Sequence, residues 1–250
     1  MDILECQGVT KAYGGLLAVQ DVSFSVESGE VFAIVGPNGA GKTTLFDAIS
    51  GVTRATQGMV RFEGAEIQRL RPHEISRLGL VRTFQTTVAF DSQTVLANAL
   101  VGALFGRRNG ERIGLVFPQR AIDASLEALA FCGLADRQSA SARTLSNLDR
   151  KRLMLATALA TKPKLLLLDE PAGGLSPGER TEMIDLIRTV NQSGVTVVLI
   201  EHVMKAVQAL ASRMLVLHHG RTITEGRPAD VLRDQRVVEV YLGMATAGGE

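Results

Sequence analysis

The residues whose chemistry is easiest to interpret lie at positions 36–44, where the sequence fits the phosphate-binding pattern G-x-x-x-x-G-K-[ST]. Glycines let such a loop curl so that its backbone N–H groups point inward at phosphate oxygens. Lys42 is placed to reach the β- and γ-phosphates of a nucleotide, and the Thr43 hydroxyl is placed to bind Mg²⁺. The expected nucleotide-binding loop consists of Gly36, Pro37, Asn38, Gly39, Ala40, Gly41, Lys42, Thr43 and Thr44.

The segments on either side of this loop provide the context that phosphate binding needs. A buried strand, Val31–Val35, leads into the loop, and an apolar helix leaves it near Lys42. The N-terminus of that helix adds partial positive charge for the phosphates. The alternative is an ordinary glycine-rich turn with a surface lysine. Such a turn would fit the sequence of 36–44, but it would not need a buried strand before it and a helix after it.

Two adjacent carboxylates, Asp169 and Glu170, follow the apolar run Leu165–Leu168. The carboxyl end of a buried strand is where open α/β sheets bind ligands. Because neighbouring strand residues point in opposite directions, the two acids are expected to have different roles. Asp169 would hold Mg²⁺, and Glu170 would orient and polarise the attacking water. The alternative is a strand that ends in a solvated turn at Pro171, but the phosphate loop upstream favours catalysis.

Alternating apolar runs and helical patterns predict an α/β fold with a doubly wound sheet. Residues 1–65 are instead β-rich, with the alternating strand Val22–Val26, and residues 87–160 indicate a mainly helical insertion. The expected buried strands are Val31–Val35, Leu165–Leu168, Val195–Ile200 and Arg213–Leu217. The expected helices are Thr43–Ser50, Val95–Leu104, Ile122–Phe131, Arg150–Ala160, Gly178–Asn191 and Val203–Ala211.

Composition argues against several classes of protein. The formal net charge is +1, so no electrostatic footprint for nucleic acid stands out. No apolar run approaches the ~20 residues that span a bilayer, and we expect no secretion signal at the N-terminus. The two cysteines, Cys6 and Cys132, have no metal-ligand spacing, so we expect reduced, buried thiols of a cytosolic protein.

The combination of motifs resembles the ATP-binding subunits of ABC transporters, and among them the ATPases of branched-chain amino-acid importers. The resemblance covers residues 2–243. The superfamily motifs are Gly36–Thr44, Gln85, Leu145-Ser146, Leu165–Glu170 and His202. The motifs closer to the amino-acid importers are Gly79–Gln85, Gly174–Pro177, Leu199–His202 and Val238–Gly243, although lipopolysaccharide-export and urea-import ATPases share parts of them.

This resemblance implies an α/β P-loop NTPase of ABC type. Its core would be a mostly parallel sheet, with an N-terminal antiparallel β subdomain and a helical insertion. The ATP-binding domain would cover residues 1–243, with the helical subdomain at about 87–160 and a C-terminal tail at 244–250. ATP and Mg²⁺ are the implied cofactors.

The resemblance also implies roles for single side chains. Tyr13 would stack on adenine, and His202 would contact the γ-phosphate. Gln85 would reach Mg²⁺ and the attacking water, because a neutral amide positions water without taking its proton. Ser146 would face the γ-phosphate held by a partner subunit. The alternatives are an ordinary strand aromatic for Tyr13, a surface amide for Gln85 and a satisfied core histidine for His202.

One segment departs from the family pattern. Residues 145–149 read Leu-Ser-Asn-Leu-Asp, where these ATPases normally carry a signature such as Leu-Ser-Gly-Gly-Gln. Asn147 and Leu148 add side chains where glycines allow close approach. Asp149 adds a negative charge near a phosphate terminus, which would cost roughly 1 kcal/mol or more at an effective dielectric constant near 20. The sequence therefore predicts a signature in the expected place but a weakened one.

The family pattern also implies partners. Two ATPase subunits face each other head to tail, and each ATP lies between the phosphate loop of one and the signature of the other. We therefore expect a second ATP-binding subunit, in a homodimer or a heterodimer, and transmembrane permease subunits at the cytoplasmic face of the membrane. The segment just after Gln85 is the expected docking region. The apolar helix Thr94–Phe105 is equally compatible with docking and with a place in the core.

Other functions are possible on the sequence alone. A soluble ABC-type ATPase of DNA repair or translation usually has long coiled-coil or duplicated ATPase segments, and this sequence has neither. A weakly hydrolysing regulatory subunit would explain the weakened signature, but Glu170 and His202 argue against it. Within transporters, the alternative is the ATPase of a lipid, lipopolysaccharide or urea transporter.

Overall fold

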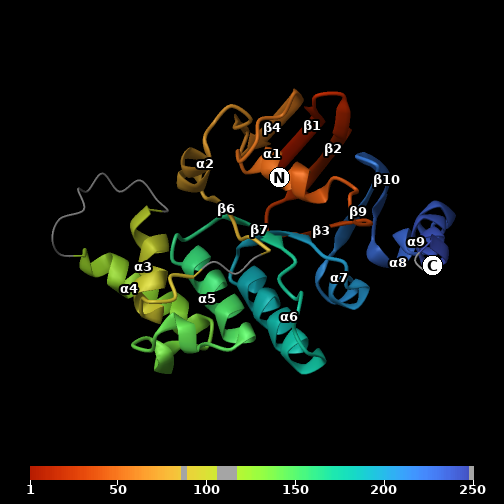
Figure 1. The fold of residues 1–250 in the computed structure, drawn as a ribbon. Helices are drawn as coiled ribbons and strands as arrows, with labels where there is room; N and C mark the ends of the chain where they lie inside the picture. The colour runs from red at the N-terminus through yellow and green to blue at the C-terminus, as the bar shows by residue number, and fades with distance from the viewer. Residues whose placement is uncertain (86–88, 106–116, 248–250) are drawn as a thin grey trace. The chain divides into compact units, whose positions relative to one another are not determined.

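A computed structural model describes residues 1–85, 89–105 and 117–247. The chain forms two compact units (Figure 1). The first unit consists of Met1–Arg71 and Thr196–Glu250, and the second unit is Pro72–Val195. The predicted helical insertion, about 87–160, therefore lies inside the second unit.

The first unit contains an antiparallel sheet and a group of mainly parallel strands. The antiparallel sheet has the strand order β2-β1-β4-β5, and α1 packs against β1 and β2 (Figure 1). In the other group, β8 and β9 pair in parallel with the two sides of β3, and β10 pairs antiparallel with β9. The strands are β1 (Asp2–Tyr13), β2 (Leu16–Glu27), β3 (Val31–Val35), β4 (Gln57–Phe62), β5 (Ala65–Glu66), β8 (Thr196–Ile200), β9 (Arg213–His218) and β10 (Arg221–Gly226). The helices are α1 (Lys42–Ile49), α7 (Met204–Leu210), α8 (Pro228–Val231) and α9 (Gln235–Ala247).

The second unit combines a short parallel strand pair with a helical layer. Strands β6 and β7 pair in parallel, with Arg82 opposite Leu167, and helices α3, α4 and α5 pack on one another. At Gly102 of α3, an added Cβ would lie 1.9 Å from the Thr157 carbonyl oxygen of α5, so glycine permits this close helix crossing. The elements are α2 (Pro72–Leu78), β6 (Leu80–Arg82), α3 (Val95–Phe105), α4 (Gln119–Phe131), η1 (Ala135–Arg137), η2 (Ala142–Thr144), α5 (Asn147–Leu159), β7 (Leu165–Asp169) and α6 (Pro177–Gln192).

The α/β fold class predicted from the sequence is confirmed. The apolar runs became strands because their side chains are buried on both faces, as all five residues of β3, β7 and β8 are. Helix α5 begins at Asn147 rather than at the expected Arg150, because Ser146 caps it. The division into an ATP-binding domain over 1–243 and a tail over 244–250 remains a prediction.

Candidate active site

The predicted phosphate loop follows β3 in the first unit. Gly36 has φ +150°, and an added Cβ there would lie 2.1 Å from the Leu217 carbonyl oxygen of β9. At Gly41, with φ +99°, an added Cβ would lie 2.3 Å from the Ala18 carbonyl oxygen. Any side chain at these two positions would collide with backbone, so the route of the loop requires glycine.

Lys42 is the first residue of α1 and lies across the loop. Its side chain is largely buried, and Nζ donates hydrogen bonds to the carbonyl oxygens of Gly36 at 2.7 Å and Pro37 at 2.9 Å. Thr43 is exposed and Thr44 is half-buried at the start of the same helix. The loop thus presents a lysine ammonium and a hydroxyl at a helix N-terminus, which are the groups that bind phosphate and its metal.

Two further predicted residues belong to the first unit. His202 follows β8, which pairs with β3 through Ile34 and Ile200, so His202 lies at the sheet edge from which the phosphate loop leaves. The buried Glu201 carboxylate accepts the His202 N–H at 3.2 Å and fixes this turn. Tyr13 is 49% exposed at the end of β1, and Lys11 Nζ lies 4.7 Å from the centroid of its ring. An exposed aromatic face is compatible with the predicted stacking role.

In the second unit, Asp169 ends β7 and forms a buried ion pair. The Arg82 Nη2 atom lies 3.1 Å from Asp169 Oδ2, and the two side chains are 5% and 4% exposed. Strand pairing explains the contact, because β6 places Arg82 beside the end of β7. The predicted magnesium ligand therefore has a fixed internal cation beside it.

Glu170 and Gln85 are in direct contact in the second unit. Gln85 Nε2 donates a 2.7 Å hydrogen bond to Glu170 Oε2. Glu170 has φ +49°, a left-handed conformation that costs energy for a residue with a side chain and is often found at functional sites. Its carbonyl oxygen accepts hydrogen bonds from the Gly173 N–H at 3.1 Å and from Lys151 Nζ at 3.2 Å.

The side chains of Ser146, Leu148 and Asp149, in the weakened signature, make their contacts within the second unit. Ser146 is the N-cap of α5, and its Oγ accepts the Asp149 N–H at 3.1 Å. Leu148 is 7% exposed and packs in the core. The Asp149 carboxylate lies 3.4 Å from an Arg152 nitrogen and 3.7 Å from an Arg137 nitrogen. Its charge is therefore partly neutralised, so the cost expected from the sequence is reduced.

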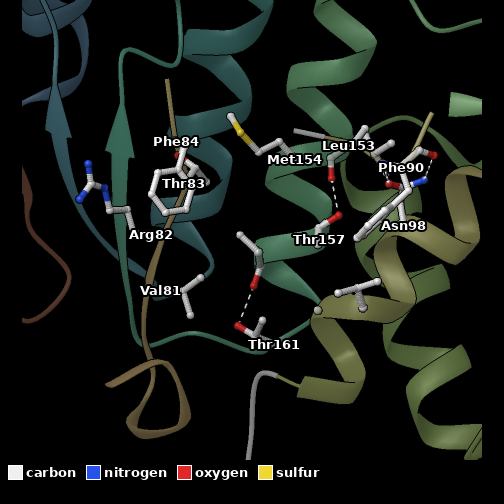
Figure 2. A pocket seen from close by; sticks show the side chains of 14 residues that line it. Val81, Arg82, Thr83, Phe84, Phe90, Asn98, Leu153, Met154, Thr157 and Thr161 are labelled. Atoms are coloured by element: carbon white, nitrogen blue, oxygen red, sulfur yellow. Dashed lines mark hydrogen bonds between the residues drawn. The ribbon is translucent and has the colours of Figure 1, made fainter. Parts of the chain in front are cut away.

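A cavity of about 250 Å³ lies beside the segment that leads to Gln85 (Figure 2). Residues from the end of β6 line one side, and residues of α3 and α5 line the other, while Arg82 points away from it (Figure 2). Phe84, Phe90 and Val101 line this cavity and are also exposed to solvent. The buried Asn98 of α3 holds Phe90 in place, accepting its N–H at 2.7 Å and donating to its carbonyl oxygen at 3.2 Å.

These observations bear on the predicted docking regions. The α3 helix is partly core, since Val95, Ala99 and Leu100 are buried, and partly surface, since Val101 and Phe105 are exposed. One side of this helix is therefore core, while docking at its exposed side stays a prediction. Of the segment just after Gln85, residues 86–88 lie outside the described residues.

Sequence reasoning missed three residues that contact the predicted site residues. They are Arg82 on Asp169, Lys151 on the Glu170 carbonyl, and Tyr241 of α9, whose buried hydroxyl lies near Gly36 without a hydrogen bond of normal geometry. Burial raises the pKa of the Tyr241 hydroxyl, and the nearby N–H of Gly36 opposes that rise. All three contacts join segments far apart in the chain, so no local pattern could reveal them. The two phosphate-contact candidates, Lys42 and His202, belong to the first unit, whereas Gln85, Ser146, Asp169 and Glu170 belong to the second.

Comparison with known proteins identifies the family. The ABC transporter family model matches residues 19–173, and the model for the branched-chain amino acid ATP-binding cassette transporter matches residues 221–243. The high-affinity branched-chain amino acid transport ATP-binding protein BraF of Pseudomonas aeruginosa is 38% identical over 252 residues, which cover 97% of this chain and 98% of BraF. The chain belongs to the ABC transporter family.

Solved structures of ABC transporter cassettes have the same fold. The ADP conformation of an ATP-binding cassette is 33% identical and superimposes with a TM-score of 0.88, covering 97% of this chain and 99% of that cassette. A dimeric bacterial ABC transporter cassette is 25% identical, with a TM-score of 0.77 and coverage of 90% and 98%. In the described part of this ABC-family chain, no helix is both long and apolar enough to cross a membrane.

Proposed function

We propose that the chain is the ATP-hydrolysing subunit of an ABC importer for branched-chain amino acids, bound at the cytoplasmic face of the membrane. The observation that carries this proposal is the match to BraF over almost the full length of both chains. The family model at residues 221–243 supports the same substrate class. The geometry of the loop at 36–44 supports binding of a phosphate group, and the match to ATP-binding proteins supports ATP as the nucleotide.

The side chains divide the work of phosphoryl transfer, which depends mainly on positioning and charge neutralisation. Lys42 neutralises the β- and γ-phosphates, and His202 contacts the γ-phosphate. Glu170 accepts a proton from the attacking water, which Gln85 orients. Tyr13 stacks on adenine, and the remaining loop residues cradle the phosphates.

Magnesium fits the donor atoms that these residues offer. The Thr43 hydroxyl, the Gln85 amide oxygen and the Asp169 carboxylate are hard oxygen ligands, which Mg²⁺ prefers together with phosphate oxygens. When bound, the ion supplies charge neutralisation on the transferring phosphoryl group. The ion pair with Arg82 holds the Asp169 carboxylate in place.

Two kinds of protein partner complete the proposed function. A second ATP-binding subunit places its signature on the nucleotide held by Lys42, while Ser146 of this chain serves the nucleotide of that subunit. The dimeric cassette supports such an assembly. Transmembrane permease subunits dock an apolar segment at the cavity beside Phe84 and Phe90, where exposed aromatic side chains leave apolar surface uncovered (Figure 2).

The proposal is tested with the purified chain and with the reconstituted transporter. Lys42→Ala should weaken Mg-ATP binding about 100-fold or more, because the buried ammonium makes charge-assisted bonds to phosphate. Lys205→Ala, at an exposed lysine of α7, is the matched control and should bind normally. Co-purification should then recover permease subunits, and vesicles containing the complex should take up leucine only with ATP. If leucine uptake were as fast with the Lys42→Ala variant as with the unmodified chain, the proposal would be contradicted.

A further inference from the structure

The side chain of Asn147 connects the signature segment to the turn that follows β7. Asn147 is the first residue of α5, and its Nδ2 donates a 2.9 Å hydrogen bond to the Gly174 carbonyl oxygen. Gly174 has φ +69°, and an added Cβ there would lie 3.6 Å from Asn147 Nδ2. A glycine at position 147, as in the usual signature, has no side chain to make this bond.

A second contact joins the same helix to the same turn. Lys151, one turn further along α5, is buried and donates from Nζ to the Glu170 carbonyl oxygen at 3.2 Å. That oxygen also accepts the Gly173 N–H. Helix α5 therefore holds the turn at both of its ends, at Glu170 and at Gly174.

The turn held in this way contains a strained residue. Glu170 has φ +49°, and such a conformation persists only where its surroundings determine it. The Glu170 carboxylate is aimed at Gln85, 2.7 Å away. A turn that relaxed would move this carboxylate, and a small misplacement of a catalytic group lowers the reaction rate strongly.

We propose that Asn147 is a positioning residue that clamps the start of α5 to the 170–174 turn and so maintains the catalytic geometry of Glu170. This inference rests on the proposed function only for the role of Glu170 in hydrolysis. The sequence predicted that Asn147 weakens the signature, whereas the clamp gives Asn147 a role that supports hydrolysis. Asn147 does not merely crowd the signature; it supports this chain's own catalytic carboxylate.

The first test is hydrogen exchange on the full chain without nucleotide. Asn147→Asp keeps the size of the side chain but loses the donor at neutral pH, and Asn147→Gly removes the side chain. In both variants the backbone amides of residues 172–176 should exchange about three- to tenfold faster, which is the effect of one lost hydrogen bond. Asn147→Gln keeps the amide donor and should restore part of the protection.

The chain offers a matched control for general loss of stability. Asn191 Nδ2 donates to the Val195 carbonyl oxygen at 2.9 Å, which is the same kind of bond at the far end of α6. Asn191→Asp should leave the exchange of residues 172–176 unchanged. An equal effect of Asn191→Asp on that turn would show a general loosening and would overturn the clamp.

The second test is ATP hydrolysis, where the two interpretations of Asn147 predict opposite results. If Asn147 clamps the turn, Asn147→Gly lowers kcat about fivefold or more with the KM for ATP within about twofold, because the phosphate loop is unchanged. If Asn147 only weakens the signature, Asn147→Gly raises kcat and leaves the turn protected. That second result would overturn the inference.

Failure of the proposed function and failure of the clamp give different experimental results. If the unmodified chain did not bind Mg-ATP, the proposed function would be wrong whatever the exchange of the turn showed. If it bound and hydrolysed ATP while neither Asn147 variant changed the exchange of residues 172–176, the clamp alone would be wrong.

Discussion

Gln85 Nε2 donates a hydrogen bond to Glu170 Oε2 over 2.7 Å. The amide expected to orient the attacking water and the carboxylate expected to polarise it therefore touch each other directly. A change at either residue alters the hydrogen-bonding options of the other, so the two should be treated as one functional pair.

Glu170→Gln should preserve ATP binding and reduce the rate of hydrolysis by about 100-fold or more. The new amide keeps the shape of the side chain and can still accept the Gln85 bond, but it has lost the basicity that a general base needs. ATP turnover is measured beside nucleotide affinity, and size-exclusion chromatography should show an ATP-bound dimer that accumulates. The same substitution at the exposed Glu127 of α4 is the control. Normal turnover by Glu170→Gln would transfer the role to another residue, with His202 the next candidate.

Arg82→Met should lower the free energy of unfolding by about 3–5 kcal/mol, because it removes one member of a buried ion pair. Chemical denaturation measures the loss, and adding Asp169→Asn to the same chain should recover part of it. The exposed pair of Arg188 and Asp185 gives the comparison, since Arg188→Met should cost less than about 1 kcal/mol. Equal losses at Arg82 and Arg188 would show that burial of the first pair is unimportant.

Phe90→Ser should weaken association with detergent-solubilised permease subunits about tenfold, because an exposed aromatic at the proposed docking cavity is lost. ATP binding should be unaffected, since Phe90 belongs to the second unit and the phosphate loop to the first. Phe131→Ser, at another partly exposed aromatic of the second unit, is the control. If both variants bind the permease as tightly as the unmodified chain, the docking surface lies elsewhere.

Acidification should destabilise the chain partly through His218, at the end of β9. Burial, with a smaller effect of His219, lowers the pKa of His218 below its ordinary value of 6.5. The folded chain therefore binds this proton less readily than the unfolded chain, and the stability present above pH 6.5 is lost as the pH falls through the folded pKa. Thermal unfolding between about pH 7 and about pH 5 should show a shallower pH dependence for His218→Gln. An unchanged slope in this variant, matching that of His73→Gln, would rule out the contribution.

The sequence could predict those parts of the fold that depend on burial along one segment. Strands β3 and β7 were found because continuous apolar runs are typical of strands covered on both faces. Strand β6 was missed, since three residues are too short to show a period. The start of α5 was placed too late, although Ser146 followed by Asp149 three residues later is a pattern of a helix N-terminus.

The candidate site was predicted in its residues but not in its contacts. Motifs pointed to Gln85, Asp169 and Glu170 individually. The Gln85–Glu170 bond joins residues 85 positions apart, and the Arg82–Asp169 ion pair joins residues 87 positions apart beside the paired strands β6 and β7. The burial of Leu148 and the ion pairs of Asp149 were likewise beyond a local pattern, because they depend on what α5 packs against.

The crowding at Gly36 limits how this protein can vary. A Cβ at that position meets the Leu217 carbonyl oxygen of β9, so β9 would have to move before any other residue could occupy the start of the loop. At Gly39, by contrast, no atom lies within 4 Å of the added Cβ, and asparagine or aspartate tolerates its φ of +76°. Mutational tolerance within the loop is therefore set by the neighbouring strand as well as by the nucleotide, and libraries that diversify the loop should vary position 39 and leave position 36 unchanged.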